Sequence, residues 1–302
     1  MDAYNNAPKD SASAQTPRQN QKQGSLQRCN DRQQNPHKSK NTTVQKNGTI
    51  VRLSNTLSSP PMQTTKEKIV AAYEKLAERY NALIDHKPHN AYYDRPNTLG
   101  LLPEVKGKNI LDAACGPGKY AEILLSKGAA VTGFDISPKM IALAKARNNG
   151  RGNFFVHDMS EPFEMFADEQ FDIIVCALAL AYIQDWTLTI QEFCRVLKPK
   201  GILVISTDHP FFDYTFFNST QYFAVENVRC VWKGFGIPVE INTYRRPLSE
   251  YLLPLTDNGF YIDKLIEPKP TKEFEKLDPR HFKELNEFPS FMCIRAVKRE
   301  TN

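Results

Sequence analysis

The chain has 302 residues, of which 41% are hydrophobic, and its 39 Lys and Arg stand against 34 Asp and Glu. This length and apolar content allow one large domain or two small ones around a sizeable core. Residues 1–61 hold the excess positive charge, and the nearly neutral remainder argues against nucleic acid as the main ligand, because phosphate binding needs a clustered cationic face.

The cysteine pattern argues against a metal-binding protein, and the hydropathy pattern argues against a membrane-spanning one. The six cysteines form no C-x-x-C pair, and several lie in apolar runs, as small core residues do. We therefore expect a reducing, cytoplasmic compartment and no metal site. The longest apolar run, 173–183, has 11 residues, and a membrane helix needs roughly 18 or more, so we expect no membrane span.

Residues 1–61 are rich in Asn, Gln, Lys, Ser and Pro and carry few large apolar groups. They bury too little surface to offset the entropy of ordering, about 1–2 kcal/mol per residue, so we expect a disordered basic tail. Contact of this tail with RNA or a membrane surface is a weaker interpretation than a solvated tail. Met62 is an alternative start, because every recognisable pattern belongs to a domain predicted to span 62–302.

The first pattern is helical and runs from Thr64 to about Ile84. Its apolar residues recur at spacings of three and four and so form one face: Ile69, Tyr73, Leu76, Tyr80 and Leu83. Thr64 or Thr65 is placed to cap the helix, with Glu67 in its first turn. A polar, aromatic link follows at 86–96.

From residue 108 onward, short apolar runs alternate with amphipathic segments. Strands are predicted at 109–115, 130–136, 153–159, 171–180 and 202–209, with helices at 118–127, 138–148 and 185–197 and a turn at 198–201. This alternation indicates a parallel sheet covered on both faces. A helix at 247–258, then strands at 259–268 and 290–299 joined by a long polar loop, predict an antiparallel end to a doubly wound, seven-stranded α/β sheet.

The turn after the first predicted strand supports two interpretations. Gly116, Gly118 and Ala121 fit G-x-G-x-x-G/A, and Asp135 ends the second strand 19 residues after Gly116, which is formally a dinucleotide fingerprint. The same physics serves any adenosine ligand, because glycine lets the backbone approach closely and a carboxylate accepts from ribose hydroxyls. The pattern alone therefore leaves the ligand open.

Two residues near this turn argue against NAD. Asp112 lies four residues before Gly116, where its carboxylate would oppose a pyrophosphate but would suit an ammonium group. Pro117 lacks the N–H that a cradle for an anion would use.

The segment "DAACGPG" at 112–118 resembles the D-x-G-C-G-x-G motif of class I S-adenosylmethionine-dependent methyltransferases, with Ala114 where that family usually has Gly. "GFDISPKMIALAKAR" and "EFCRVLKPKGILVIS" are similar to later segments of the family, so the resemblance covers 107–208. Pieces such as "NGFYIDKLIEP" resemble the small-molecule, ubiquinone/menaquinone methyltransferase-like branch (type 11). The resemblance implies a Rossmann-like methyltransferase fold, with a cofactor-binding core at 107–208 and a substrate lid and C-terminal strands at 209–302.

The resemblance also implies roles for individual residues. Asp112 would bind the amino group of the cofactor, Asp135 its ribose hydroxyls and Asp158 its adenine amino group. A capping role remains the alternative for Asp135 and Asp158, and core packing for Ala177. The other expected cofactor contacts are made by packing or close backbone approach: Gly116, Gly118, Ile136, Met159 and Ala177.

His209 ends the fifth predicted strand, where ligands of open α/β sheets lie, and it is the candidate catalytic base. Its ordinary pKa, about 6.5, lets it accept a proton at neutral pH. Asp208 is the poorer candidate, because strand alternation should point it the other way. A turn role before Pro210 is the alternative for His209.

Aromatic residues are the candidates for enclosing the site. Tyr92 and Tyr93 are expected to close over the cofactor and Tyr182 to line the substrate pocket, with ordinary packing as the alternative for each. The aromatic segment 210–223 is either a lid that excludes water or filling between the last strands.

We therefore expect an enzyme that transfers a methyl group from S-adenosylmethionine to a small-molecule acceptor by in-line displacement, without a metal. The alternatives are a catalytically silent binder of the same cofactor and an NAD-dependent dehydrogenase. An RNA methyltransferase has the basic tail as its sole support.

A shortened chain that starts at Met62 should keep the melting temperature and the S-adenosylmethionine affinity of the full chain, because the composition of the tail leaves little to pack. Calorimetry on both chains measures the two quantities. A melting temperature several degrees lower in the shortened chain would show that residues 1–61 pack on the domain.

Overall fold

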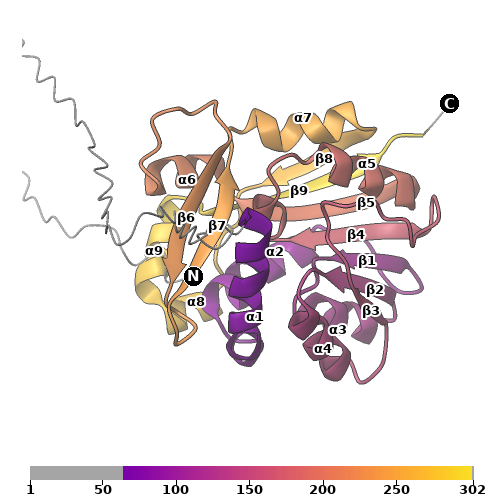
Figure 1. Ribbon diagram of the computed structural model, residues 1–302, viewed down its shortest axis with the longest axis horizontal. Helices are drawn as coiled ribbons and strands as arrows, with labels where there is room; N and C mark the ends of the chain where they lie inside the picture. Colours follow the sequence, from indigo (N-terminus) through magenta and orange to yellow (C-terminus); the bar gives the residue numbers. More distant parts are fainter. Residues whose placement is uncertain (1–63, 301–302) are drawn as a thin grey trace, which may run out of the picture. The chain divides into compact units, whose positions relative to one another are not determined.

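The computed structural model describes residues 64–300 (Figure 1). The predicted basic tail, together with Met62, lies outside the described residues. The strands are β1 (Asn109–Ala113), β2 (Ala130–Asp135), β3 (Asn153–Val156), β4 (Phe171–Ala177), β5 (Leu197–Asp208), β6 (Glu226–Trp232), β7 (Val239–Arg245), β8 (Phe260–Ile266) and β9 (Phe291–Lys298).

The helices lie between these strands and before the first of them. They are α1 (Thr65–Leu83), η2 (Asn90–Asp94), α2 (Arg95–Gly100), α3 (Lys119–Ser126), α4 (Pro138–Arg147), η3 (Leu180–Tyr182), α5 (Thr187–Val196), α6 (Pro210–Phe216), α7 (Ser249–Asp257), α8 (Lys272–Leu277) and α9 (Pro279–Glu287). None of the helices in residues 64–300 is long and apolar enough to cross a membrane.

Seven strands form one sheet in the order β3-β2-β1-β4-β5-β9-β8. Strands β1 to β5 pair in parallel, whereas β9 is antiparallel to both β5 and β8. The predicted doubly wound α/β sheet with an antiparallel end is therefore confirmed. The strand order reverses beside β1, because the chain moves outward to β2 and β3 and then returns to place β4 on the other side of β1.

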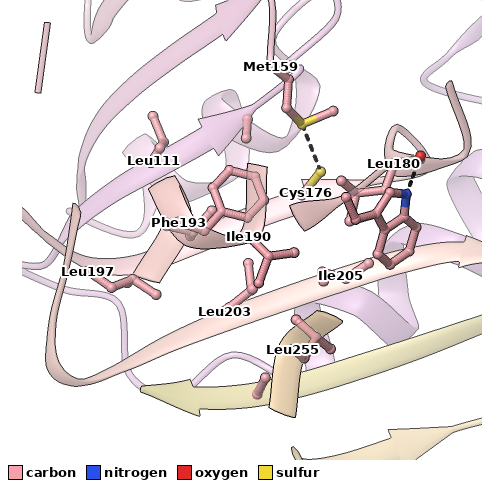
Figure 2. Packing of buried hydrophobic residues seen from close by; sticks show 14 of the residues in the cluster. Leu111, Met159, Cys176, Leu180, Ile190, Phe193, Leu197, Leu203, Ile205 and Leu255 are labelled. Atoms are coloured by element: carbon pink, nitrogen blue, oxygen red, sulfur yellow. Dashed lines mark hydrogen bonds between the residues drawn. The ribbon is translucent and has the colours of Figure 1, made fainter. Parts of the chain in front are cut away.

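Alternate side chains of each central strand pack against different helix layers. Leu111 and Ala113 of β1 belong to a cluster that includes Phe193 of α5 and Leu255 of α7, and Figure 2 shows Leu111 and Phe193 in this packing. Ile110 belongs instead to the cluster with α3 and α4. Both faces of β1 are thus dry, and a polar group on this strand must find its partners inside the protein.

The cap of α1 forms as its sequence predicts. The backbone N–H of Glu67 donates to Thr64 Oγ1 at 3.2 Å, and the backbone N–H of Thr64 donates to Glu67 Oε2 at 2.8 Å. This reciprocal pair satisfies two donors at the helix start. It fixes the first turn of α1, from which Lys66 reaches the sheet.

The structure departs from the sequence predictions before β1 and from β5 onward. The expected turn at 198–201 is part of β5, where Lys200 has a φ of +62° and the register with β4 shifts between Phe171 and Ile173. The expected polar loop before the last strand contains α8 and α9. Sequence reasoning also missed η2, α2, α6 and the separate β6–β7 hairpin.

Candidate active site

A cavity of about 270 Å³ lies at the carboxyl ends of β1, β2 and β4, where the strand order reverses. Ligands of open α/β sheets bind at this position. Helix α1 contributes Lys66, Ile69 and Tyr73 to its wall, so the predicted first helix closes the cavity over the sheet. Most of the residues predicted to bind a cofactor line it: Asp112, Gly116, Asp135, Ile136, Asp158, Met159 and Ala177.

The two glycines after β1 have different tasks. Gly116 has a φ of +53° and lines the cavity, and a Cβ placed there would meet no atom within 4 Å, so its open side faces free space. Gly118 has a φ of +77°, and its Cβ would lie 2.7 Å from Asn148 Nδ2 and 3.0 Å from Ala144. The Gly118 position therefore serves the close packing of α3 on α4, and this glycine does not line the cavity, unlike the prediction.

Ala114 adopts the left-handed conformation, with a φ of +56°, and lines the cavity. This conformation costs an L-residue roughly 1–2 kcal/mol. Alanine at this position, where the motif usually has glycine, therefore still forms the turn but strains its backbone locally.

Asp112 is a buried carboxylate on β1, with 2% of its surface exposed. Its Oδ2 accepts the backbone N–H of Ala121, in the first turns of α3, at 3.1 Å. Burial raises the pKa of Asp112 to about 7, although the hydrogen bond from Ala121 acts against this. A cationic group in the cavity would favour the ionised form.

Asp135 connects the end of β2 to the glycine turn. Its Oδ2 accepts the N–H of Gly116, and its Oδ1 accepts the N–H of Ser137, both at 2.9 Å. Burial raises the pKa of Asp135 to about 6, against the opposing effect of these two hydrogen bonds. The carboxylate therefore holds the turn in shape while it lines the cavity.

Asp158 follows β3 and forms an ion pair with Lys66 of α1. Its Oδ1 accepts the backbone N–H and the hydroxyl of Ser160, both at 2.8 Å. Burial acts to raise the pKa of Asp158, but Lys66 and Ser160 outweigh it and hold this pKa below its ordinary value. The next residue, Met159, is buried with its sulfur 3.6 Å from Cys176 Sγ (Figure 2).

Tyr182 lies on η3 and lines the cavity, as predicted for a pocket residue. Its hydroxyl lies 2.5 Å from the hydroxyl of Tyr73, and the two rings meet edge to face with centroids 5.6 Å apart. The pair joins α1 to the loop after β4, and both of its rings also line a second, smaller cavity.

The second cavity, called the inner chamber below, has a volume of about 50 Å³. It shares five lining residues with the first cavity: Tyr73, Tyr80, Asn90, Leu178 and Tyr182. Its remaining wall comes from Ala181 of η3, from the end of β5, from α6 and its end, and from the β6–β7 hairpin. Figure 1 shows this hairpin beside α1 and α6.

Tyr92 and Tyr93 line neither cavity, which argues against the predicted closure over a cofactor. Tyr93 is fully buried, stacks on Phe291 and accepts the N–H of Ser290 at 3.1 Å with its hydroxyl oxygen. Asn90 and Asp94, at the two ends of the same helix, line the first cavity instead.

His209 also lies outside both cavities, and this placement argues against it as the base. Its Nδ1 accepts the N–H of Phe211 at 3.3 Å and caps α6, and its Nε2 lies 3.0 Å from Glu267 Oε1. Burial lowers the pKa of His209, against the opposing effect of Glu267. Asp208 lines the inner chamber, contrary to the prediction from strand alternation.

The comparisons with known proteins agree on one family. Residues 111–205 match the family model described as "Methyltransferase domain". YqeM of Bacillus subtilis, which carries a provisional methyltransferase name, is 33% identical over 217 residues, which are 68% of this chain and 83% of YqeM. A demethylmenaquinone methyltransferase of Staphylococcus epidermidis is 29% identical over 159 residues, which are 49% of this chain and 64% of that protein.

A solved structure has the same fold. The S-adenosylmethionine-dependent methyltransferase from Mesorhizobium loti superposes with a TM-score of 0.56 at 23% identity, over 71% of this chain and 100% of that one. The chain belongs to the class I S-adenosylmethionine-dependent methyltransferase family. It is therefore an enzyme that uses S-adenosylmethionine, and the interpretation of its glycine turn as an NAD site is set aside.

The cavity of this methyltransferase fits that cofactor. Carboxylates at three neighbouring strand ends can accept from amino groups and hydroxyls, Ile136 and Met159 provide apolar surface, and the open side of Gly116 leaves room for close approach. No group of three or more His, Cys, Asp or Glu side chains in residues 64–300 has a geometry that could hold a metal ion.

Sequence reasoning missed Tyr73, Asn90 and Asp213 as cavity residues. Tyr73 was assigned only to the apolar face of α1, and Asn90 lay in a link with no predicted structure. Asp213 is the one acidic residue in the aromatic segment "PFFDYTFF", and this isolated acid is the feature of the sequence that could have indicated a cavity residue.

Replacing Ala114 with Gly should raise the free energy of unfolding by about 0.5–1 kcal/mol. Relief of roughly 1–2 kcal/mol of left-handed strain exceeds the entropy that glycine adds to the unfolded chain, about 0.4–1 kcal/mol. Denaturant unfolding measures the change. The matched control is Ala113→Gly in β1, which removes a buried methyl without relieving strain and should destabilise. A loss of stability in Ala114→Gly would contradict the strain assignment.

Proposed function

We propose that this methyltransferase transfers the methyl group to a small-molecule acceptor by in-line displacement. The observation that carries the proposal is the inner chamber, which adjoins the cofactor cavity across Tyr73 and Tyr182 and has a volume of only about 50 Å³. A chamber of this size has room for the reacting end of a small molecule. The chamber shares a wall with the larger cavity, so an acceptor in it could approach the methyl group of the cofactor from the side opposite the sulfur that the methyl group leaves.

The proposed cofactor contacts follow the side chains of the first cavity. Asp112 binds the amino group of the methionine part, Asp135 the ribose hydroxyls and Asp158 the adenine amino group, while Ile136 and Met159 pack on the adenine. Gly116 allows close backbone approach, and Ala177 lies beneath the cofactor. These roles are supported by the placement of all seven residues on the cavity wall.

S-adenosylmethionine supplies a methyl group that its sulfonium already activates. The protein then needs to orient the acceptor and exclude water, and orientation can contribute up to roughly 7–11 kcal/mol. The partly buried Tyr73–Tyr182 pair lies at the junction of the two cavities, a position that suits both tasks. We place this reaction in the cytoplasm, because the five described cysteines are all free thiols, which suits a reducing compartment.

Two alternatives remain. The first is a catalytically silent protein that binds S-adenosylmethionine through the same three carboxylates, Asp112, Asp135 and Asp158, but transfers no methyl group. An RNA acceptor rests on the basic composition of residues 1–61, which lie outside the described residues. The next experiment separates both from the proposal.

Incubation of the enzyme with an extract and methyl-labelled S-adenosylmethionine should place the label in the low-molecular-weight fraction. The Asp135→Asn variant should bind the cofactor about 10- to 150-fold more weakly, since it loses a charged acceptor worth roughly 1.5–3 kcal/mol, and should label proportionally less at low cofactor concentration. Asp263→Asn, at an exposed ion pair on β8, is the matched control. Label in the RNA or protein fraction, or no label at all despite cofactor binding, would contradict the proposal.

A further inference from the structure

A buried arginine lines the larger cavity. Arg95 begins α2, directly after η2, and only 6% of its surface is exposed. It does not line the inner chamber. A buried positive charge is costly unless the groups around it compensate it, so the partners of this guanidinium group indicate its role.

The described residues use few of the donors of this guanidinium group. Arg95 Nη2 donates to the carbonyl of Ile84, at the end of α1, at 2.8 Å. Arg95 Nε is buried and has no hydrogen-bond partner. No carboxylate in residues 64–300 forms an ion pair with Arg95. Because a guanidinium group carries five N–H donors, most of these donors have no acceptor in the described part of the protein.

The neighbouring Asp94 does not satisfy these donors. It also lines the cavity, and the charge of Arg95 acts to lower its pKa, although burial outweighs this effect and raises the pKa. Both oxygens of the carboxylate accept from other side chains. Oδ1 accepts the hydroxyl of Thr98 at 3.1 Å, and Oδ2 accepts the hydroxyl of Tyr120 at 2.6 Å. Asp94 therefore acts on Arg95 through space and leaves its N–H groups available to a ligand.

The two lysines on the wall of the larger cavity differ from this arginine, because both have carboxylate partners. Lys119 forms ion pairs with Asp85 at 3.2 Å and with Glu122 at 2.6 Å. Lys66 forms an ion pair with Asp158. Among the Lys and Arg side chains of residues 64–300 that line this cavity, the arginine is thus the one without an ion pair.

Arg95 is connected to Asp112 through the start of α3. Its guanidinium carbon lies 5.9 Å from the centre of the Tyr120 ring. The next residue, Ala121, donates its backbone N–H to Asp112. A guanidinium group and a carboxylate therefore line the cavity from positions that contact consecutive residues of one helix. This pair of charges is complementary to an α-amino acid, which carries an ammonium group and a carboxylate on one carbon.

We propose that Arg95 binds the carboxylate of the methionine part of S-adenosylmethionine, beside the amino group that Asp112 binds. This inference rests on the proposed placement of the cofactor in the larger cavity. A carboxylate accepts two parallel hydrogen bonds from a guanidinium group and so uses donors that the protein leaves without a partner. Arg95 is then a specificity-determining residue, which selects ligands that carry the complete amino acid part.

The other parts of the cofactor explain this arginine less well. The sulfonium is itself positive and would be repelled by a guanidinium group. The ribose hydroxyls and the adenine amino group have carboxylate acceptors in the proposed arrangement, Asp135 and Asp158, which follow other strands. The carboxylate is the anionic group of the cofactor, and Arg95 is the described cation that can receive it.

The first test uses the wild-type enzyme and three ligands. Calorimetry at neutral pH compares S-adenosylhomocysteine with its decarboxylated analogue, which keeps the amino group, and with methylthioadenosine, which lacks the whole amino acid part. S-adenosylhomocysteine should bind at least about tenfold more tightly than the decarboxylated analogue, which corresponds to 1.4 kcal/mol. Equal or tighter binding of the decarboxylated analogue would overturn the inference.

Variants assign the preference to Arg95. Arg95→Met should bind S-adenosylhomocysteine no more tightly than the decarboxylated analogue, while its affinity for methylthioadenosine stays within about twofold of the wild-type value. Arg95→Lys keeps the charge without the planar guanidinium group and should retain part of the preference. Arg295→Met is the matched control, because Arg295 pairs with Asp263 outside both cavities, and it should leave all three affinities unchanged.

The outcomes separate a ligand contact from a structural role. A loss confined to S-adenosylhomocysteine reports the carboxylate contact, whereas an equal loss for all three ligands would show that Arg95 only supports the wall and would overturn the inference. An unchanged preference in Arg95→Met would overturn it as well. If Arg95→Met fails to fold, the wild-type comparison and Arg95→Lys still decide. Failure of the wild-type enzyme to bind any of the three ligands would instead count against the cofactor site and hence the proposed function.

Discussion

The burial of carboxylates at the ends of parallel strands is the constraint on which the site depends. An ionised carboxylate away from water is costly unless nearby donors compensate it. The fold provides these donors from its own backbone: Asp112 accepts from the start of α3, and Asp135 accepts from Gly116 and Ser137. The elevated pKa values of Asp112 and Asp135 show that this compensation is incomplete. A ligand with amino and hydroxyl donors would complete it.

The segments outside the central sheet enclose the site that lies at the carboxyl ends of the parallel strands. Helix α1 packs against β7 and α4, and its Lys66 reaches Asp158 while its Tyr73 meets Tyr182. The β6–β7 hairpin and α6 then form the far wall of the inner chamber. In the proposed function, the cofactor is therefore recognised mainly at the ends of the sheet strands, whereas the acceptor is recognised by the segments around the sheet.

The sequence predicted the sheet well because burial on both faces produces continuous apolar runs, such as "FDIIVCA", between amphipathic helices. Most of the residues predicted to bind the cofactor do line the larger cavity, because they lie at or just after strand ends, where the cavity opens. Gly118 was assigned a ligand contact because a sequence motif does not distinguish space kept for a ligand from space filled by Ala144 of a neighbouring helix.

The acceptor side was predicted poorly for physical reasons. Strand alternation was extended through Asp208 to His209, but β5 ends at Asp208 and His209 begins the cap of α6, so the alternation no longer applies. The π-helical turn at 90–94 places Asn90 on the cavity wall and sends Tyr93 into the core against Phe291. Such placements depend on tertiary contacts between distant segments, which local periodicity does not contain.

The central claim is that the cofactor lies in the larger cavity with its reacting end at the Tyr73–Tyr182 pair, facing the inner chamber. A crystal structure of the enzyme with S-adenosylhomocysteine tests it most directly. The account predicts ribose hydroxyls on Asp135, the amino group near Asp112 and the sulfur at the boundary with the inner chamber. A bound ligand whose sulfur faces away from Tyr73 and Tyr182, or whose ribose lies far from Asp135, would contradict it.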